Sequence, residues 1–173
     1  DTLTDKNIKT ANIPLCVTKI GKKAFKNFKK LERVNIPQSV KVIEEGAFQG
    51  CQKLVTVNIP NSINGKSLGK SAFQGCKSLK YIYIPSSVKK INDKTFKSNE
   101  KLIKVCLSEG LEEIGKDAFE GCQSLKFIEI PESIKMIENG AFLNCTVLSD
   151  MVLKSRNSCI KYNAIPCQVK KFV

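Results

Sequence analysis

Cysteine is the residue type in this sequence with the widest range of chemistry. The 173 residues include eight cysteines, and thiols can form disulfides, bind soft metals or act as nucleophiles. Zinc sites that use cysteine contain close pairs such as C-x-x-C, and no such pair occurs here. The chain also has no histidine, which excludes Ser-His-Asp and Cys-His catalytic units and histidine-ligated zinc or haem. We therefore expect no metal site and no cofactor.

The carboxylates do not suggest another catalytic centre. The acidic residues occupy variable positions beside a recurring V-x-x-I pattern, where charges are ordinarily solvated. They are Glu44, Glu45, Glu112, Glu113 and Asp117. No nucleophile stands beside a base, and no complete phosphate-binding loop is present. We therefore predict that the protein is not an enzyme.

The composition is that of an ordinary globular domain, with 42% hydrophobic and 26% charged residues. A chain of this length fits one domain and can bury a substantial core. The first residues, DTLTDKNIKTANIP, lack the charged and apolar regions of a signal peptide. No run of eighteen apolar residues occurs, so we expect no membrane insertion by this chain.

Phenylalanines recur along the chain at intervals of 23, 25, 23, 23 and 23 residues. These are Phe25, Phe48, Phe73, Phe96, Phe119 and Phe142. Around each of them the template V-x-x-I-x-x-x-A-F-x-x-C-x-x-L-x-x-I-x-I-P returns. A fixed period between 20 and 29 residues is typical of a leucine-rich-repeat solenoid. The two extra residues of the third repeat fall between Ile63 and Leu68, at the turn-prone pair Asn64-Gly65.

The repeats predict a single solenoid domain over residues 1–173. Residues 1–14 are expected to form a truncated repeat, and residues 15–153 form six repeats of about 23 residues. Residues 154–173 depart from the template, and we expect an irregular cap that closes the exposed end of the core.

The spacing within each repeat predicts its local structure. Apolar residues alternate in L-x-x-V-x-I-P, which indicates a half-buried strand with Val34 and Ile36 inward and Arg33 and Asn35 outward. In A-F-x-x-C-x-x-L the apolar residues have helical spacing, so we expect a short helix or 3₁₀ turn on the opposite side. The fold class is therefore an α/β solenoid with a parallel sheet.

This template resembles the BspA-type leucine-rich repeat over roughly residues 3–153. The resemblance implies a right-handed superhelix with the parallel sheet on its concave face. It also implies cell-surface proteins of bacteria and parasitic protists that bind host matrix or cell-surface proteins. Such repeats also occur inside cells, so the resemblance leaves a cytoplasmic location open.

The cysteines fall into two groups. Four of them occupy one position of the template, which holds phenylalanine or asparagine in other repeats, so we expect buried structural thiols: Cys51, Cys76, Cys122 and Cys145. The others are Cys16, Cys106, Cys159 and Cys167. A Cys159–Cys167 disulfide, or a glycan at Asn144 in Asn144-Cys145-Thr146, would indicate secretion, whereas eight free thiols would favour the cytosol.

The outward positions of the predicted strands form columns across the sheet. In its middle they gather aromatic and apolar residues with lysines beside them, and Phe127 is the only repeat phenylalanine placed outward. We predict a ligand-binding site there. Its residues are Lys80, Tyr81, Tyr83, Ile103, Lys104, Cys106 and Phe127. The competing interpretation is that these β-favouring side chains merely stabilise the strands.

The formal net charge is +13, and most of it lies in the first half of the chain. Seven cations gather in the first full repeat: Lys19, Lys22, Lys23, Lys26, Lys29, Lys30 and Arg33. They could attract a polyanion such as a sulfated glycan, or could simply keep the protein soluble. No base-recognition motif accompanies them, so nucleic acid is not the expected partner.

These observations predict a non-enzymatic protein-interaction module, a surface or secreted adhesin-like protein by resemblance. The alternatives are an intracellular leucine-rich-repeat scaffold that uses the same face, and a polyanion binder that uses the amino-terminal lysines.

Overall fold

The computed structural model describes residues 6–64, 67–169 and 171–172. Within them the chain forms fifteen short strands and no helix, and successive strands alternate between two sides of a coil. The long-strand side contains β1 (Thr10–Asn12), β3 (Arg33–Asn35), β5 (Thr56–Val57), β7 (Tyr81–Ile84), β9 (Lys104–Leu107), β11 (Phe127–Ile130), β13 (Asp150–Leu153) and β15 (Lys171–Phe172). The other side contains β2 (Lys19–Ile20), β4 (Val42–Ile43), β6 (Ser67–Leu68), β8 (Lys90–Ile91), β10 (Glu113–Ile114), β12 (Met136–Ile137) and β14 (Cys159–Ile160).

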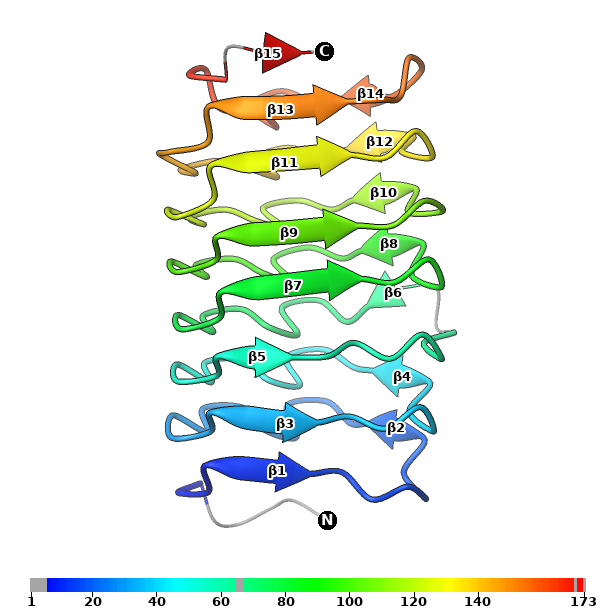
Figure 1. Ribbon diagram of the computed structural model, residues 1–173, viewed down its shortest axis with the longest axis vertical. Coiled ribbons are helices and arrows are strands. Elements are labelled where there is room, and N and C mark those ends of the chain that lie inside the picture. The colour runs from blue at the N-terminus through cyan, green and yellow to red at the C-terminus, as the bar shows by residue number, and fades with distance from the viewer. Residues whose placement is uncertain (1–5, 65–66, 170, 173) are drawn as a thin grey trace.

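The chain winds as a parallel-strand solenoid of about six turns. Every strand pair is parallel, and strands of one side follow one another up the coil (Figure 1). Followed from β1 upward, each turn crosses the long-strand side from left to right and returns behind, which is a right-handed path (Figure 1). The solenoid predicted from the period is therefore the observed architecture.

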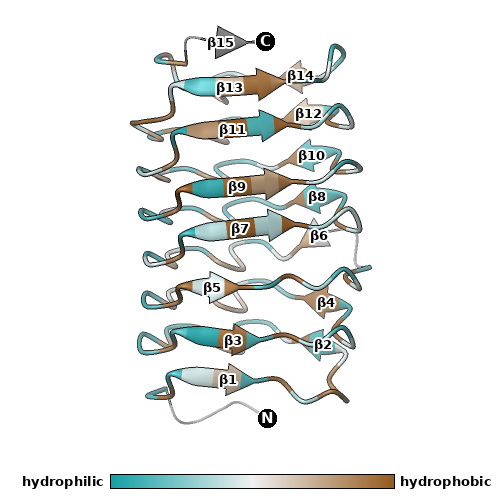
Figure 2. Ribbon diagram, in the orientation of Figure 1, coloured by the Kyte–Doolittle hydropathy of each residue, from teal (hydrophilic) through white to brown (hydrophobic). Residues whose placement is uncertain are grey.

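The strand registers reproduce the repeat length. Arg33 lies beside Thr56, Tyr81 beside Lys104, and Phe127 beside Asp150, each pair 23 residues apart. Hydrophilic and hydrophobic residues alternate along the long strands (Figure 2). Val34 and Ile36 are buried, whereas Arg33 and Asn35 are exposed, so the predicted inward and outward sets are confirmed.

The six repeat phenylalanines form one continuous stack inside the coil. Neighbouring rings lie 5.0–5.5 Å apart between centroids, and their planes differ by 3–10°. Alanine, leucine, isoleucine and valine of the template surround the stack in one buried core. One turn alone could not bury its phenylalanine, so each turn depends on its neighbours.

The segment around each phenylalanine is not the expected helix but a series of turns. The N–H of Gln49 and the N–H of Cys51 close four-residue turns onto the carbonyls of Gly46 and Phe48. The intervening N–H groups of Gly46, Phe48 and Gly50 instead donate to the next turn of the coil. In a helix all of these N–H groups would donate to carbonyls four residues earlier in the same segment. The residues two before and two after the phenylalanine also have positive φ, 62° at Gly46 and 73° at Gly50, which a helix cannot contain.

The last part of the chain continues the coil. In residues 154–173, where we expected an irregular cap, β14 pairs with β12 and β15 pairs with β13. Ala164 is buried and its carbonyl accepts the N–H of Phe142, as alanines do in the preceding turns. Of the insertion in the third repeat, Gly65 and Lys66 lie outside the described residues.

Candidate protein-binding face

Four thiols are part of the core. Cys51, Cys76, Cys122 and Cys145 are completely buried and free, and each Sγ donates to the carbonyl of a phenylalanine in the preceding turn. The Sγ–O distances are 3.1–3.4 Å, so these are weak S–H···O hydrogen bonds. The predicted burial of these thiols is confirmed, although they follow a turn and not a helix.

Burial also fixes the protonation state of three of these thiols. It raises the pKa of Cys51 to about 12 and raises the pKa values of Cys76 and Cys122 well above the ordinary value of 9.0. The neighbouring thiols Cys51 and Cys145 add smaller upward contributions for Cys76 and Cys122, respectively. A thiol held in this way is neither a nucleophile nor a metal ligand at neutral pH.

These pKa values predict that alkali destabilises the fold. The folded state keeps the thiols neutral while the unfolded chain ionises them near pH 9, so their contribution is complete below pH 9 and is lost as pH rises. Between pH 9 and 10 the free energy of unfolding should fall by about 1 kcal/mol per thiol. Urea titrations under reducing conditions measure this loss. A Cys51→Ala/Cys76→Ala/Cys122→Ala variant should lose much less over the same interval, and an equal loss would contradict the assignment.

The other four thiols are also free but lie near the surface. Cys16, Cys159 and Cys167 are exposed, and Cys106 on β9 is half-buried. Cys159 lies on β14 and Cys167 in the turn that follows, and both are free thiols in this structure. The bridge between them stays a prediction for an oxidising environment.

The predicted ligand-binding residues share one surface, which we call the long-strand face. Register places Tyr81 beside Lys104 and Tyr83 beside Cys106. Phe127 starts β11, which follows β9 up the same side (Figure 1). The side chains of Tyr81, Tyr83, Ile103 and Phe127 are 46–55% exposed, and Lys80 and Lys104 are exposed among them. The structure thus brings the predicted set together, while concave curvature of this face stays an expectation.

Ser108 is a member of this face that the sequence reasoning missed. It occupies the position where the template ends its strand with proline, and its Oγ donates to the Tyr83 hydroxyl oxygen at 3.0 Å. The contact holds one tyrosine hydroxyl, and so its ring, in a defined orientation. The departure from proline, which is shared only with Lys154 after β13, was the available signal.

The middle of the long-strand face carries lysines without ion-pair partners. In the described residues, no ion pair involves Lys80, Lys104 or Lys126. The carboxylate of Glu129 is instead paired with Lys154 beyond the strand ends, and this raises the pKa of Lys154. The middle of the face therefore combines exposed rings with unneutralised positive charge.

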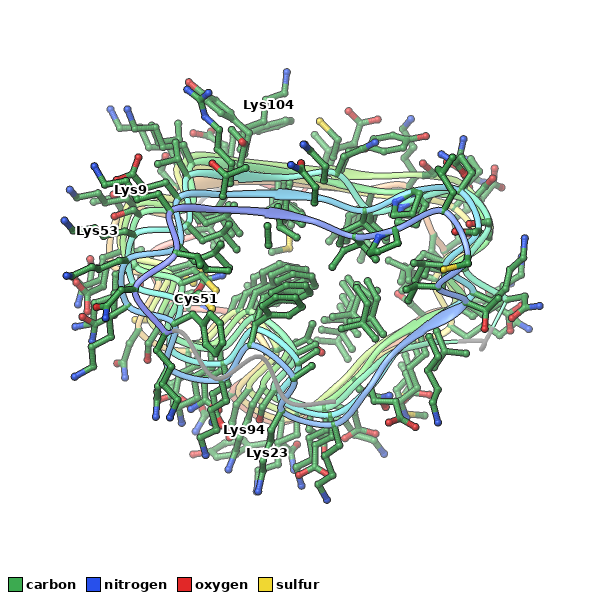
Figure 3. All side chains as sticks on the ribbon, turned by 90° about the horizontal axis from the view of Figure 1, so that it is seen from below. Lys9, Lys23, Cys51, Lys53, Lys94 and Lys104 are labelled. Carbon is green, nitrogen blue, oxygen red and sulfur yellow. The ribbon has the colours of Figure 1, made fainter. Side chains whose placement is uncertain are left out.

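The amino-terminal lysine cluster is not one surface. Lys19 and Lys22 pair with Glu44 and Glu45 at 3.4 and 2.8 Å, and the Lys22–Glu45 contact lowers the pKa of Glu45. Arg33 lies on the long-strand face, whereas Lys23 projects from the opposite side (Figure 3). Residues close in sequence are thus distributed around the coil, and the remaining members are Lys26, Lys29 and Lys30.

Asn144 lies in an exposed turn at the carboxy-terminal end of the described coil, with a positive φ of 58°. Thr146 is exposed too, and Cys145 between them is buried. Asn144 and Thr146 also line a depression of about 470 Å³. The glycosylation site stays a prediction.

Nothing in the described part of the chain assembles a metal site. No group of three or more cysteine, aspartate or glutamate side chains converges there. The same residues contain no helix long and apolar enough to cross a bilayer.

Comparison with known proteins identifies the fold family. A model of the BspA-type leucine-rich repeat region, in six copies, matches residues 2–65 and 66–171. The chain belongs to the BspA-type leucine-rich repeat family. Such repeat proteins are generally non-enzymatic protein-interaction modules. No curated protein matches the sequence.

Solved leucine-rich repeat proteins share this architecture. One from Bacteroides ovatus is 37% identical with a TM-score of 0.78, and one from Treponema pallidum is 30% identical with a TM-score of 0.73. They match 84% and 81% of this chain, respectively. A third, from Eubacterium ventriosum, is 25% identical and matches 95% of this chain with a TM-score of 0.86. The chain covers only 39%, 64% and 44% of these proteins.

Proposed function

We propose that this BspA-type repeat protein is a surface or secreted adhesin-like module that binds a protein ligand on its long-strand face. The exposed cluster of Tyr81, Tyr83, Ile103 and Phe127 carries the proposal. Aromatic side chains in the middle of a face are the usual energetic anchors of protein interfaces. Cross-strand packing would also place such side chains on a sheet face, so the binding experiments below distinguish a binding site from strand stabilisation.

The lysines of the face extend the proposal to the partner's charge. Lys80, Lys104 and Lys126 carry no ion pair within the described chain, so an approaching acidic protein meets no competing carboxylate on them. Such charges raise association rates and select partners more than they add affinity. The partner, a matrix or cell-surface protein by family resemblance, is therefore expected to present acidic residues around an apolar centre.

A labelling experiment on the native cysteines tests which face binds. Cys106 lies within the candidate site and Cys16 lies outside it, and both can be left as the single surface thiol by changing the other three to serine. A bulky polyethylene glycol maleimide on Cys106 should prevent binding to an immobilised basement-membrane extract, whereas the same group on Cys16 should leave binding intact. Buried thiols do not compete for the label.

The outcomes separate the candidate functions. Loss of binding with both labels, with neither, or with the Cys16 label alone would contradict the long-strand face as the site. An unlabelled chain that does not bind the extract or intact cells would contradict the adhesin-like function and favour the intracellular scaffold.

A further inference from the structure

A band of cations that are far apart in sequence runs along one edge of the long-strand face, and it shares Lys80 and Lys104 with the candidate protein-binding site. The turn before each of the long strands β3 to β13 ends in the template's leucine, which is replaced by Ile8 before β1, and the residues flanking this position are rich in lysine. We call this row the strand-start stripe. Its members are Lys9, Lys30, Arg33, Lys53, Lys80, Lys101, Lys104 and Lys126. All eight side chains are exposed.

The repeat register aligns the stripe along the coil axis. Lys30, Lys53 and Lys101 stand directly before the leucines of their turns, at equivalent positions of the template. Viewed along the axis, Lys9 and Lys53 project together from the same side of the coil (Figure 3). Neighbouring turns are about 4.8 Å apart, so the stripe spans roughly 24 Å from Lys9 to Lys126.

The stripe is not neutralised by the protein itself. In the described residues none of its eight cations forms an ion pair, although seven lysines elsewhere do. The same positions of the described turns contain only two carboxylates, Glu32 and Asp150. The stripe therefore contributes a net charge of +6 to the +13 of the chain. A row with this excess of positive charge creates a field that attracts and orients a linear polyanion.

We infer that the strand-start stripe binds a linear sulfated polysaccharide, a function beyond protein binding on the long-strand face. Seven of the eight cations are lysines, which act as flexible point charges and suit sulfate groups without fixed bidentate geometry. Single-stranded nucleic acid would instead need rings on which successive bases stack. Tyr81 and Phe127 lie two turns apart, about 10 Å, with Lys104 between them, and cannot provide that series.

The three lysines directly before the leucine provide a clean test. Serine occupies the same position at Ser78 and Ser124, where the Ser124 hydroxyl donates to the Glu100 carbonyl, so serine fits the turn. In a Lys30→Ser/Lys53→Ser/Lys101→Ser variant, binding of a fluorescent heparin octasaccharide at 50 mM salt should weaken by at least about a hundredfold. The slope of log Kd against log salt concentration should fall by about two to three. None of these lysines belongs to the protein-binding cluster, so this result is independent of that function.

A matched variant separates the stripe from net charge. Lys23→Asn/Lys94→Asn/Lys116→Asn removes the same three charges, and Lys23 and Lys94 project from the side away from Lys104 (Figure 3). Asparagine tolerates the positive φ of Lys23 and Lys94. This variant should bind the octasaccharide within about twofold of wild type, because distant exposed charges are screened. Equal losses in both variants, no binding by the wild type, or tighter binding of an oligothymidylate of equal charge would overturn the inference.

Discussion

Replacing Phe96 by alanine should lower the free energy of unfolding by about 3–5 kcal/mol, the cost of truncating a fully buried aromatic ring. Phe96 is completely buried and stacks between Phe73 and Phe119, with ring centroids 5.5 and 5.3 Å away. Its removal leaves a cavity in the middle of the array and weakens the interfaces with both neighbouring turns. Urea unfolding followed by circular dichroism measures the loss.

Phe127→Ala is the matched control, because it makes the same chemical change on the long-strand face. Phe127 is 48% exposed and leaves no cavity, so its truncation should change the unfolding free energy by about 0.5 kcal/mol or less. Similar losses for the two variants would contradict the assignment of Phe96 to the core stack. Since stability in a solenoid is a sum over turns and interfaces, Phe96→Ala is also expected to let the two halves of the array unfold in separate transitions.

The second large effect concerns binding. A Tyr81→Ala/Phe127→Ala variant should bind the basement-membrane extract at least about a hundredfold more weakly than the wild type, because central aromatic anchors each contribute strongly to interfaces. Both rings are about half exposed and neither contributes to the core, so folding should be almost unchanged. Surface plasmon resonance on the immobilised extract measures the affinity, and thermal melting checks the fold.

Leu15→Ala/Tyr162→Ala provides the control for exposed apolar area in general. Leu15 and Tyr162 are 82% and 83% exposed, more than the two rings of the candidate site, and both lie outside the long strands. This variant should bind like the wild type. If its affinity fell as far as that of Tyr81→Ala/Phe127→Ala, nonspecific adhesion by apolar surface would replace the proposed site.

The sequence predicted the coil and its faces because two periods act together. Alternation along a strand separates Val34 from Arg33, and the 23-residue repeat places Tyr81 beside Lys104. Both follow from backbone geometry that does not depend on surface side chains. The candidate site could therefore be located before the structure was known.

The turn around each phenylalanine could not be distinguished from a helix in this way. Apolar residues three apart fit either conformation, and the decisive groups are N–H donors that bond to the next turn of the coil. The left-handed positions are glycine in some repeats, as at Gly46, but Lys23 and Asp117 in others, so composition alone concealed them. The lysine cluster is divided for a related reason, since Lys23 and Arg33 lie on opposite sides of the coil although they are ten residues apart, whereas residues 23 apart are neighbours.

The hydrogen-bond pattern also determines how the molecule would respond to mechanical load. The first and last described strands, β1 and β15, lie at opposite ends of the coil (Figure 1), so tension between them acts along the axis and across each hydrogen-bonded interface. The turns would then separate one at a time, because the load breaks the hydrogen bonds of one interface after another instead of shearing all of them at once. Each released repeat of 23 residues supplies about 80 Å of extended chain, so a molecule anchored at both ends could lengthen stepwise under load while its remaining turns stay folded.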